Sequence, residues 1–400
     1  MAVERFALGD PAQVAAQVRG LAPGAESVTD AVAAIVADVR ERGDAALRAY
    51  VERFDGVAGP LRVEPGGELD ADVRAGLETA IENVRTVAEA GLATDRNVQL
   101  PQGHVVRVRE IPVRRAAIYV PGGRAPYPST VVMGVVTARV AGVDEVVVCA
   151  PGVHPLILAT CALCGADEVY SMGGAHAVAA LAYGTETIPP VDVIAGPGNL
   201  YVQEAKRLVS GDVGIDGFAG PSDVLVLASA GAEPRLAAID LAAQAEHGEG
   251  TIVCAVSDDP ALLDAIELDP GDAAAALVDA PDVETALRFA EAFAPEHLEL
   301  VGAAAEALAP RVRSAGCVFV GREGATAFGD YVAGSNHTLP TGGAARFASG
   351  LNVGHFRRRM SEVRIGSATA ALAAAGAPIA RAEGFERHAA SMEVRENPTP

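Results

Sequence analysis

Short apolar runs alternate with helical patterns through the middle of the chain, and this alternation limits the fold more than any other feature of the sequence. One series spans residues 116–209 and a second spans residues 224–320. The apolar runs are rich in Val, Ile and Ala, as buried strands are, while the segments between them repeat apolar residues at helical spacing. Strands separated by helices pair in parallel through right-handed crossovers. The sequence therefore predicts an α/β protein with two Rossmann-like parallel-sheet domains.

The elements of both series can be placed by residue. Strands are expected at Ala116–Val120, Glu145–Cys149, Glu168–Met172, Val191–Ala195, Val224–Leu227, Thr251–Val256, Leu298–Val301 and Cys317–Val320. Helices are expected at Thr130–Val140, Pro155–Leu163, Ala175–Tyr183, Leu200–Val209, Leu236–Ala245, Pro260–Ile266, Val283–Phe293 and Ala304–Ser314. The first hundred residues are expected to be mainly helical, and the pattern weakens after Gly342 until a helix near Ala368–Ala374.

The break between the two series, near Gly217 to Asp223, suggests the domain borders. No low-complexity linker lies there, so we expect the border between the two units to be a packed hinge. Small N- and C-terminal extensions complete the predicted organisation. The expected parts are an N-terminal arm at 1–28, a first, discontinuous α/β domain at 29–115 and 225–350, a second α/β domain at 116–224, and a C-terminal segment at 351–400.

The charge of the chain argues against a nucleic-acid partner. Asp and Glu number 52 against 31 Lys and Arg, a net charge of −21 that is spread along the whole sequence. Such a surface repels a phosphate backbone. Lys206 is the single lysine, and its neighbours form neither a P-loop nor the surroundings of a Schiff-base lysine.

Cysteine usage and hydropathy suggest a cytoplasmic protein without membrane contact. The five cysteines lie in apolar runs and are odd in number, which fits reduced thiols that serve packing. Cys161 and Cys164 have the C-x-x-C spacing but no second pair. The sequence shows no secretory signal pattern at its start and no apolar stretch of about 18 residues.

Three Gly/Pro loops follow predicted strands and suggest one ligand crevice. They are Tyr119–Arg124, Met172–His176 and Gly196–Asn199. Ligands of open parallel sheets bind beyond the carboxyl ends of the strands, where glycines let the backbone approach a phosphate. The alternative is that these glycines only end strands. The dinucleotide fingerprint G-x-G-x-x-G is incomplete, because Gly196-Pro197-Gly198 continues with Asn199-Leu200-Tyr201.

Polar candidates for a metal or catalytic site are scattered along the chain. Gln244 and His247 stand three residues apart at the end of a predicted helix and share a face. A histidine at that place is either a metal ligand or a cap or surface residue, and a ligand needs partners from distant segments such as Asp330, His337 or His388. Spacing alone leaves the choice open.

Glu296 and His297 follow Pro295 directly before a predicted strand. Proline disfavours helix for the residue before it, so the pair is expected at an extended strand entry. An adjacent carboxylate and imidazole suit water activation and general-base catalysis. The same pair also occurs on ordinary protein surfaces.

Taken together, the sequence closely resembles the histidinol dehydrogenase family from about Val32 to His388. The matching motifs keep one order and approximate spacing. They are Ala117–Gly123, Gly173–Ala175, Ala182–Glu186, Gly196–Asn199, Ala219–Ser222, Gln244–His247, Ala294–Leu300, Gly329–Gly334, Asn336–Gly343 and Ala382–Gly384.

The resemblance implies an NAD-dependent zinc enzyme that oxidises L-histidinol through L-histidinaldehyde to L-histidine with two NAD, the last steps of histidine biosynthesis. It implies one Zn²⁺ per subunit. The implied zinc ligands, which also contact the substrate, are Gln244, His247, Asp330 and His388. Zinc would act mainly as a template that holds the substrate.

The resemblance also assigns roles to further residues. His297 takes the alcohol proton at each hydride transfer and contacts the substrate, while Glu296 activates water. Other implied substrate contacts are Ser222, His337 and Glu383, and implied cofactor contacts are Tyr119, His176 and Asn199. The C-terminal segment is expected to complete the site of the neighbouring subunit in a homodimer.

The chain departs from the family at His176, where glutamine is usual, and the segment after His247 looks shortened. Two alternatives to the leading hypothesis stay open. One is a paralogous zinc- and NAD-dependent dehydrogenase for another small alcohol, and the other is a non-catalytic ligand-binding α/β protein. The presence of Glu383 and His388 argues against the first, and the presence of Glu296 and His297 argues against the second.

Overall fold

The computed structural model describes residues 3–22, 28–122, 125–217 and 222–396. Two compact units make up the fold. The first contains residues 1–91 and 113–356, and the second contains residues 92–112 and 357–400. The expected border at 217–223, the loop at 119–124 and the motif at 219–222 lie partly outside the described residues.

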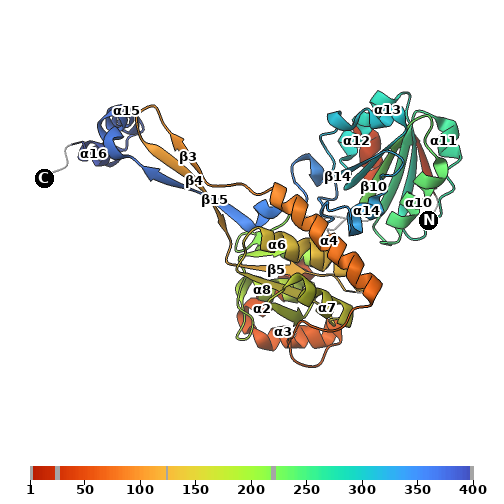
Figure 1. The fold of residues 1–400 in the computed structure, drawn as a ribbon, viewed down its shortest axis with the longest axis horizontal. Helices are drawn as coiled ribbons and strands as arrows, with labels where there is room; N and C mark the ends of the chain where they lie inside the picture. Colours follow the sequence, from red (N-terminus) through yellow and green to blue (C-terminus); the bar gives the residue numbers. More distant parts are fainter. Residues whose placement is uncertain (1–2, 23–27, 123–124, 218–221, 397–400) are drawn as a thin grey trace. The chain divides into compact units, whose positions relative to one another are not determined.

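One six-stranded sheet of the first unit is parallel throughout, in the order β1-β12-β11-β10-β13-β14 (Figure 1). Its strands are β1 (Val3–Ala7), β10 (Asp223–Ala228), β11 (Ile252–Ser257), β12 (Ala274–Asp279), β13 (His297–Val301) and β14 (Cys317–Val320). Its helices are α1 (Pro11–Arg19), α10 (Pro234–Ala245), α11 (Pro260–Asp264), α12 (Val283–Phe293), α13 (Ala303–Glu306), η4 (Ala309–Arg311) and α14 (Thr326–Tyr331).

Side chains alternate between the two faces of a strand, and two cores result. Leu225 and Leu227 of β10 pack in one cluster with α1 and α12. Val224 and Val226 pack in the other with α10 and α11. This sheet is therefore covered on both faces, as parallel sheets require.

The other six-stranded sheet of this unit has the order β2-β7-β6-β5-β8-β9, and only the short β2 pairs antiparallel among its described strands. Its strands are β2 (Arg62–Val63), β5 (Arg115–Tyr119), β6 (Glu145–Ala150), β7 (Glu168–Ser171), β8 (Val193–Ala195) and β9 (Gly214–Ile215). Its helices are α2 (Thr29–Arg42), α3 (Asp44–Tyr50), η2 (Val51–Asp55), α4 (Ala71–Ala90), α5 (Pro128–Val131), η3 (Val132–Val136), α6 (Thr137–Val140), α7 (Pro155–Cys164), α8 (Gly174–Tyr183) and α9 (Leu200–Val209).

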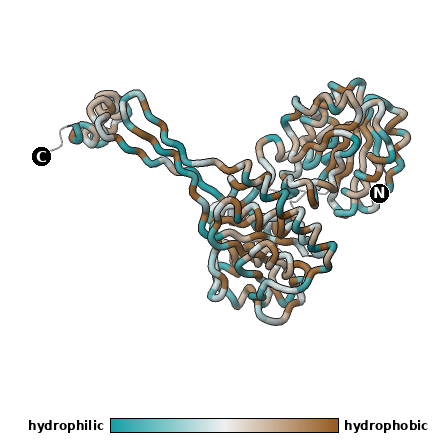
Figure 2. The backbone as a smooth tube through the Cα atoms, viewed as in Figure 1, coloured by the Kyte–Doolittle hydropathy of each residue, from teal (hydrophilic) through white to brown (hydrophobic). Residues whose placement is uncertain are grey.

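Buried aliphatic strands form the centre of each six-stranded sheet, and Figure 2 shows hydrophobic colour along them. Most strands and helices expected from the sequence are present within a few residues of their predicted ends. The expected helix at 304–314 is broken into α13 and η4, because Pro310 interrupts the helical hydrogen bonds. Strand β12 was not expected, because its alanine-rich sequence has low strand propensity.

The packing of α2 and α3 differs from the grouping expected for residues 29–115. Their buried residues, such as Val32 and Leu47, share a core with Ala117 and Val147 of the sheet at 116–224, and not with residues 225–350. Helical periodicity reports which face of a helix is apolar but not which sheet covers that face. The other predicted domain borders stay a prediction.

The described part of the second unit contains an antiparallel three-stranded sheet in the order β15-β4-β3, one short 3₁₀ helix and two α-helices. The elements are β3 (Arg96–Gln99), β4 (Val105–Pro112), β15 (Arg357–Arg364), η7 (Gly366–Ala368), α15 (Thr369–Ala382) and α16 (Glu386–Glu393). Ala377, Ala380 and Ala389 form the small core between α15 and α16.

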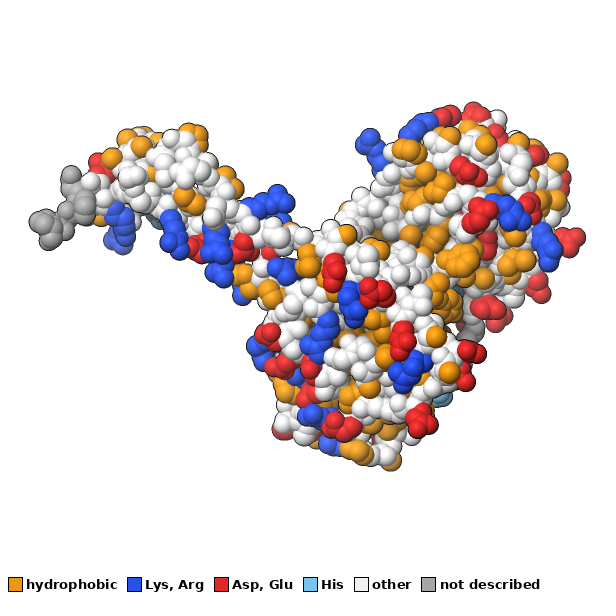
Figure 3. Space-filling view, viewed as in Figure 1, with side chains coloured by type: hydrophobic (Ala, Val, Ile, Leu, Met, Phe, Trp, Pro, Cys, Tyr) orange, Lys and Arg blue, Asp and Glu red, His pale blue; other side chains and the backbone are white. Residues whose placement is uncertain are grey.

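The second unit differs in charge from the rest of the chain. It contains ten arginines and seven Asp or Glu residues, so its net charge is +3, whereas the whole chain carries −21. Figure 3 shows charged side chains of both signs over the visible face of the protein.

The five cysteines all lie in the described part of the chain. All five cysteines are free thiols, of which Cys149, Cys161 and Cys254 are buried and Cys164 and Cys317 are partly buried. None of the helices in the described ranges is both long enough and apolar enough to cross a membrane.

Candidate active site

A cavity of about 700 Å³ lies between the carboxyl ends of β5 and β8 and the amino ends of β10, β11 and β13. The first group of ends contributes the loop from Gly196 to Asn199. The second contributes Ser222, Glu296 and His297, while Asp330 comes from α14 and His337 from the loop after it. The lining includes Ser222, His247, Glu296, His297, Asp330, His337 and Asn199.

Glu296 is buried and held by three hydrogen bonds. Its Oε2 accepts from Ser222 Oγ at 2.5 Å and from the Asp223 N–H at 3.0 Å. Its own N–H donates to Asp223 Oδ1 at 2.8 Å. Burial raises the pKa of Glu296 to about 7, against the opposing effect of the neighbouring His297. This carboxyl group therefore changes its charge near neutral pH.

His297, at the start of β13, lies between two carboxylates. Its Nε2 is 3.6 Å from Asp330 Oδ1 and its Nδ1 is 3.9 Å from Glu296 Oε2. Nδ1 is buried and has no hydrogen-bond partner among the residues described. Burial lowers the pKa of His297, but the charges of Glu296 and Asp330 outweigh burial and raise the pKa to about 9.

Asp330, His247 and His337 also line the cavity. Burial raises the pKa of Asp330, but His297, with further contributions from His337 and His247, lowers it below its usual value. His337 Nδ1 lies 3.0 Å from the Asp330 carbonyl, and its Nε2 lies 3.4 Å from Thr130 Oγ1. Burial lowers the pKa of His337, which favours a neutral ring.

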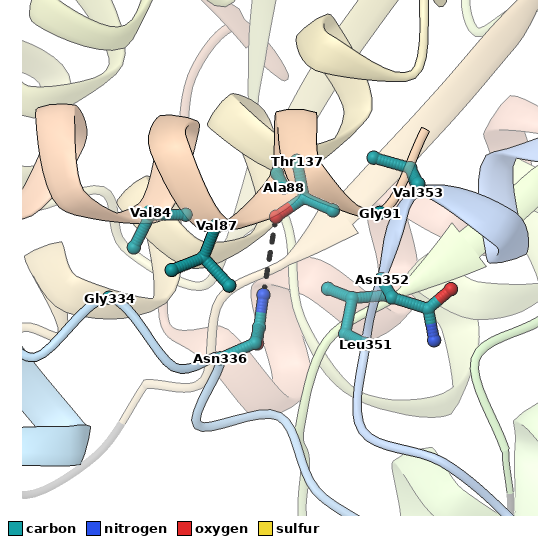
Figure 4. Close-up of a pocket in the computed structure, with 10 residues that line it drawn as sticks. All are labelled: Val84, Val87, Ala88, Gly91, Thr137, Gly334, Asn336, Leu351, Asn352 and Val353. Carbon is teal, nitrogen blue, oxygen red and sulfur yellow. Dashed lines mark hydrogen bonds between the residues drawn. The ribbon is translucent and has the colours of Figure 1, made fainter. Parts of the chain in front are cut away.

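Asn336 anchors the loop that carries His337 (Figure 4). Its amide Nδ2 donates to the Met133 carbonyl at 3.0 Å and to Thr137 Oγ1 at 3.2 Å. A smaller, largely apolar cavity of about 180 Å³ lies beside this anchor, where Val84 and Val87 of α4 face Leu351. The anchor joins the loop to the helices over β5.

Gln244, His247 and Asp330 were predicted as metal ligands. Gln244 Nε2 donates to Ser222 Oγ at 2.5 Å, and no described hydrogen bond uses its amide oxygen, but Gln244 is buried and is not among the described residues that line the cavity. His247 Nδ1 lies 3.0 Å from the Gln244 carbonyl, which leaves Nε2 for a cation. An imidazole with two oxygen donors fits a zinc ion.

The three donors do not make a complete zinc site. No group of three His, Cys, Asp or Glu side chains in the described part of the chain could hold a metal ion. A cation here needs the Gln244 amide and a fourth group in addition to His247 and Asp330.

The predicted cofactor residues divide into two sets. Asn199 lines the cavity and caps α9 by accepting from the Val202 N–H at 3.2 Å. Tyr119 and His176 are buried below the loops: Tyr119 Oη accepts from the Gly174 N–H at 3.0 Å, and His176 Nε2 lies 3.2 Å from Asp55 Oδ2. Neither is among the described residues that line the cavity. Their role at a cofactor stays a prediction.

Glu383 and His388 belong to the second unit. Glu383 directly follows α15 and His388 lies on α16, and both are exposed. The centroid of the His388 ring lies 5.1 Å from the centroid of the Phe385 ring. Their expected meeting with Gln244, His247 and Asp330 stays a prediction.

Four residues at the site were not found from the sequence. Arg19 and Asp223 form an ion pair at 3.1 Å behind Glu296. Lys206 and Asp216 line the cavity and form a second ion pair. Lys206 had one available signal, since it is the single lysine of the chain. Arg19, Asp216 and Asp223 have no such signal in the sequence, because their roles depend on tertiary contacts.

Comparison with known proteins decides the family. The model of a family described as histidinol dehydrogenase matches residues 22–396. A histidinol dehydrogenase of Natronomonas pharaonis is 44% identical over 399 residues, which cover 93% of this chain and 94% of the relative. The chain belongs to the histidinol dehydrogenase family. A second relative of that name, from Rhizobium meliloti, is 42% identical over 403 residues and covered to 93% on both sides.

A solved histidinol dehydrogenase structure agrees with this membership. The crystal structure from Elizabethkingia anophelis matches with a TM-score of 0.89 at 28% identity, and the match covers 98% of each chain. The predicted α/β class with two Rossmann-like parallel sheets is confirmed. The predicted dehydrogenase class is confirmed through the histidinol dehydrogenase family.

Proposed function

We propose that this chain is a zinc-dependent histidinol dehydrogenase that oxidises L-histidinol through L-histidinaldehyde to L-histidine with two NAD. Such an enzyme works in the last steps of histidine biosynthesis, and we place it in the cytoplasm. The observation that carries the proposal is the buried Glu296–His297 pair in a cavity that also reaches the Gly196–Asn199 loop. Family membership and this pair together favour an acid–base oxidation.

His297 is proposed as the base that takes the alcohol proton. His297 lines the cavity, and its buried Nδ1 makes no hydrogen bond in the described ranges, so no protein acceptor competes with the substrate for the proton of the ring. The carboxylates of Glu296 and Asp330 stabilise the imidazolium that forms when the proton arrives. NAD, when bound, supplies the hydride acceptor for each of the two oxidations.

Glu296 is proposed to take a proton from the water that hydrates the aldehyde. A pKa of about 7 lets this group accept and release a proton near neutral pH. Ser222 and the Asp223 N–H donate to one carboxylate oxygen and so fix its direction. The same Ser222 is a proposed substrate contact.

Gln244, His247, Asp330 and His388 are proposed to hold one zinc ion per subunit. A bound zinc ion would hold the substrate and would offset the Asp330 charge, which is one of the causes that raise the pKa of His297. His337 and Glu383 are proposed to contact the substrate. The Glu383 carboxylate suits an ammonium group.

The cofactor side is proposed to include Asn199, Tyr119 and His176. Asn199 lines the cavity. Tyr119 supports the backbone of the neighbouring glycine loop through Gly174. His176 replaces the usual glutamine and is paired with Asp55, so we propose that it acts on the cofactor through the loop that it supports.

A homodimer is proposed to complete the site, with Glu383 and His388 supplied by the partner subunit. The net charge of +3 on the second unit, within a chain of −21, supports docking of this unit on an acidic surface of another copy. A shared site makes the assembly a condition of activity.

The proposal is tested with purified protein, NAD and L-histidinol, with NADH followed by absorbance. We expect saturable turnover and a kcat/KM for L-histidinol at least about 10²-fold above that for amino alcohols without an imidazole ring, because a site built to bind that ring leaves polar groups unpaired with the analogue. Treatment with a chelator should abolish turnover and added zinc should restore it. Equal kcat/KM values for L-histidinol and the analogues would refute the substrate assignment.

A further inference from the structure

Lys206 is buried in the wall of the cavity and is not among the residues that act on the substrate in the proposed function. Its side chain is 2% exposed and that of its partner Asp216 is 6% exposed. Lys206 Nζ donates to the Gly196 carbonyl at 3.0 Å and forms an ion pair with Asp216 Oδ1. The proposed catalytic steps do not use this ammonium group.

Asp216 completes the contact with the same glycine. Its second oxygen, Oδ2, accepts from the Gly196 N–H at 2.7 Å. One ion pair therefore binds both the N–H and the carbonyl of Gly196, the first residue of the Gly196–Asn199 loop. These bonds fix the peptide planes on both sides of the residue.

Gly196 is also in direct contact with the end of β5. Its φ is +121°, and a Cβ at this position would lie 2.1 Å from the Tyr119 carbonyl oxygen. A side chain is excluded both by the conformation and by the neighbour. The loop is thus held from the side of α9 by Lys206 and from the side of the sheet by Tyr119.

A buried ion pair is a poor means of stabilising a fold. Removing two charges from water is expensive, and packed apolar residues of similar volume stabilise a protein as well or better. A buried pair does fix the geometry of the groups that it contacts. Here those groups are the backbone of the loop that carries Asn199.

We propose that Lys206 and Asp216 are positioning residues that hold the Gly196–Asn199 loop in the conformation that binds NAD. The inference rests on the proposed function, since it takes this loop as the cofactor side of the cavity. It adds a role for two residues that the proposed chemical steps leave unused. Loss of the pair should weaken NAD binding and leave L-histidinol binding unchanged.

The test uses the double variant Lys206→Met with Asp216→Asn, because either single change leaves an unpaired buried charge. The dissociation constant for NAD is measured by calorimetry, together with the KM for L-histidinol and the zinc content. We expect the Kd for NAD to rise about tenfold, with the other two values within about twofold of wild type.

The matched control is the double variant Arg115→Met with Glu168→Gln. Arg115 is also buried and paired with Glu168, but at the amino end of β5, the opposite end from Tyr119. This control should lower the melting temperature without changing the Kd for NAD. A structural role alone for Lys206 predicts the same behaviour in both double variants.

The outcomes separate the inference from the proposed function. If wild type binds NAD and the Lys206 double variant binds it equally well, the inference is wrong. If wild type binds no NAD, the proposed function is refuted, and with it the inference that rests on it. Should the double variant not fold, Lys206→Arg takes its place, because its broader guanidinium cannot bind Gly196 and Asp216 in the same way. A higher KM for NAD with an unchanged KM for L-histidinol then supports the inference, and an unchanged KM for NAD contradicts it.

Discussion

Arg19 of α1 and Asp223 of β10 form an ion pair at 3.1 Å behind the turn that leads to Glu296. The Arg19 guanidinium also donates to the carbonyls of Phe293 and Ala294. Ala294 has a φ of +49°, the single positive value for a non-glycine residue in the described ranges. Asp223 accepts from the Glu296 N–H, so this pair holds a strained turn and the carboxylate that follows it.

Replacing Arg19 by Met should therefore reduce both stability and turnover. Asp223 is fully buried, and removal of its partner leaves an unpaired charge at a cost of about 3–5 kcal/mol. The kcat should fall about tenfold, because Glu296 and His297 lose their fixed position. Calorimetry and steady-state kinetics measure the two effects. Arg311→Met, which breaks an exposed ion pair with Glu284, is the control and should change neither value appreciably.

Replacing His297 by Asn should lower kcat by about 10² or more and leave NAD and zinc binding nearly intact. The reason is that a general base typically contributes about 10²–10⁴-fold to a rate. Pre-steady-state measurement of hydride transfer reports this step directly. A normal rate in this variant would remove His297 from the mechanism.

Glu299 should make the stability of the fold depend on pH. It is buried in β13, accepts from the Thr326 N–H at 2.9 Å and from Thr326 Oγ1 at 2.6 Å, and is hydrogen-bonded to Asp240. Burial and the Asp240 charge raise its pKa from 4.5 to about 7. The folded chain thus holds more protons than the unfolded chain in this window, and the free energy of unfolding should fall as the pH rises from about 4.5 to 7.

Glu299→Gln tests this dependence, because the amide keeps the shape and the donor of a protonated carboxyl. The variant should show a smaller decline in stability than wild type, because Glu296 keeps its raised pKa, and should exceed wild type by about 1–3 kcal/mol at pH 8. Urea unfolding at several pH values measures the free energy of unfolding of each variant. Glu284→Gln, at an exposed ion pair, should keep the wild-type decline. Parallel stability curves for wild type and Glu299→Gln would contradict the assignment.

A site shared between subunits should allow two inactive variants to restore each other. His297→Asn lies in the first unit and His388→Ala in the second. If equal amounts associate at random, half of the dimers are mixed and each has one intact site, so about a quarter of wild-type activity should return. A mixture of His297→Asn with Glu296→Gln, both in the first unit, should stay inactive. Mixed dimers of the first kind without activity would show that each chain completes its own site.

Local patterns predicted the strands and the adjacent polar pair, because periodicity and motifs depend on neighbouring residues. The alanine-rich strand β12 was not predicted, because burial inside a sheet overrides its weak strand propensity. The ion pair of Arg19 with Asp223 was not predicted for another reason. The two residues are 204 positions apart, and the sequence around either residue does not indicate the other. The same holds for the choice of sheet by α2 and α3.

The most direct measurement for the proposed activity is the number of NADH molecules formed for each L-histidine. Purified protein is supplied with limiting L-histidinol and excess NAD until absorbance is constant, and the amino acid is quantified separately. Two NADH per L-histidine, without accumulated aldehyde, is the predicted result. One NADH per L-histidinol, with the aldehyde as the final product, would contradict the account.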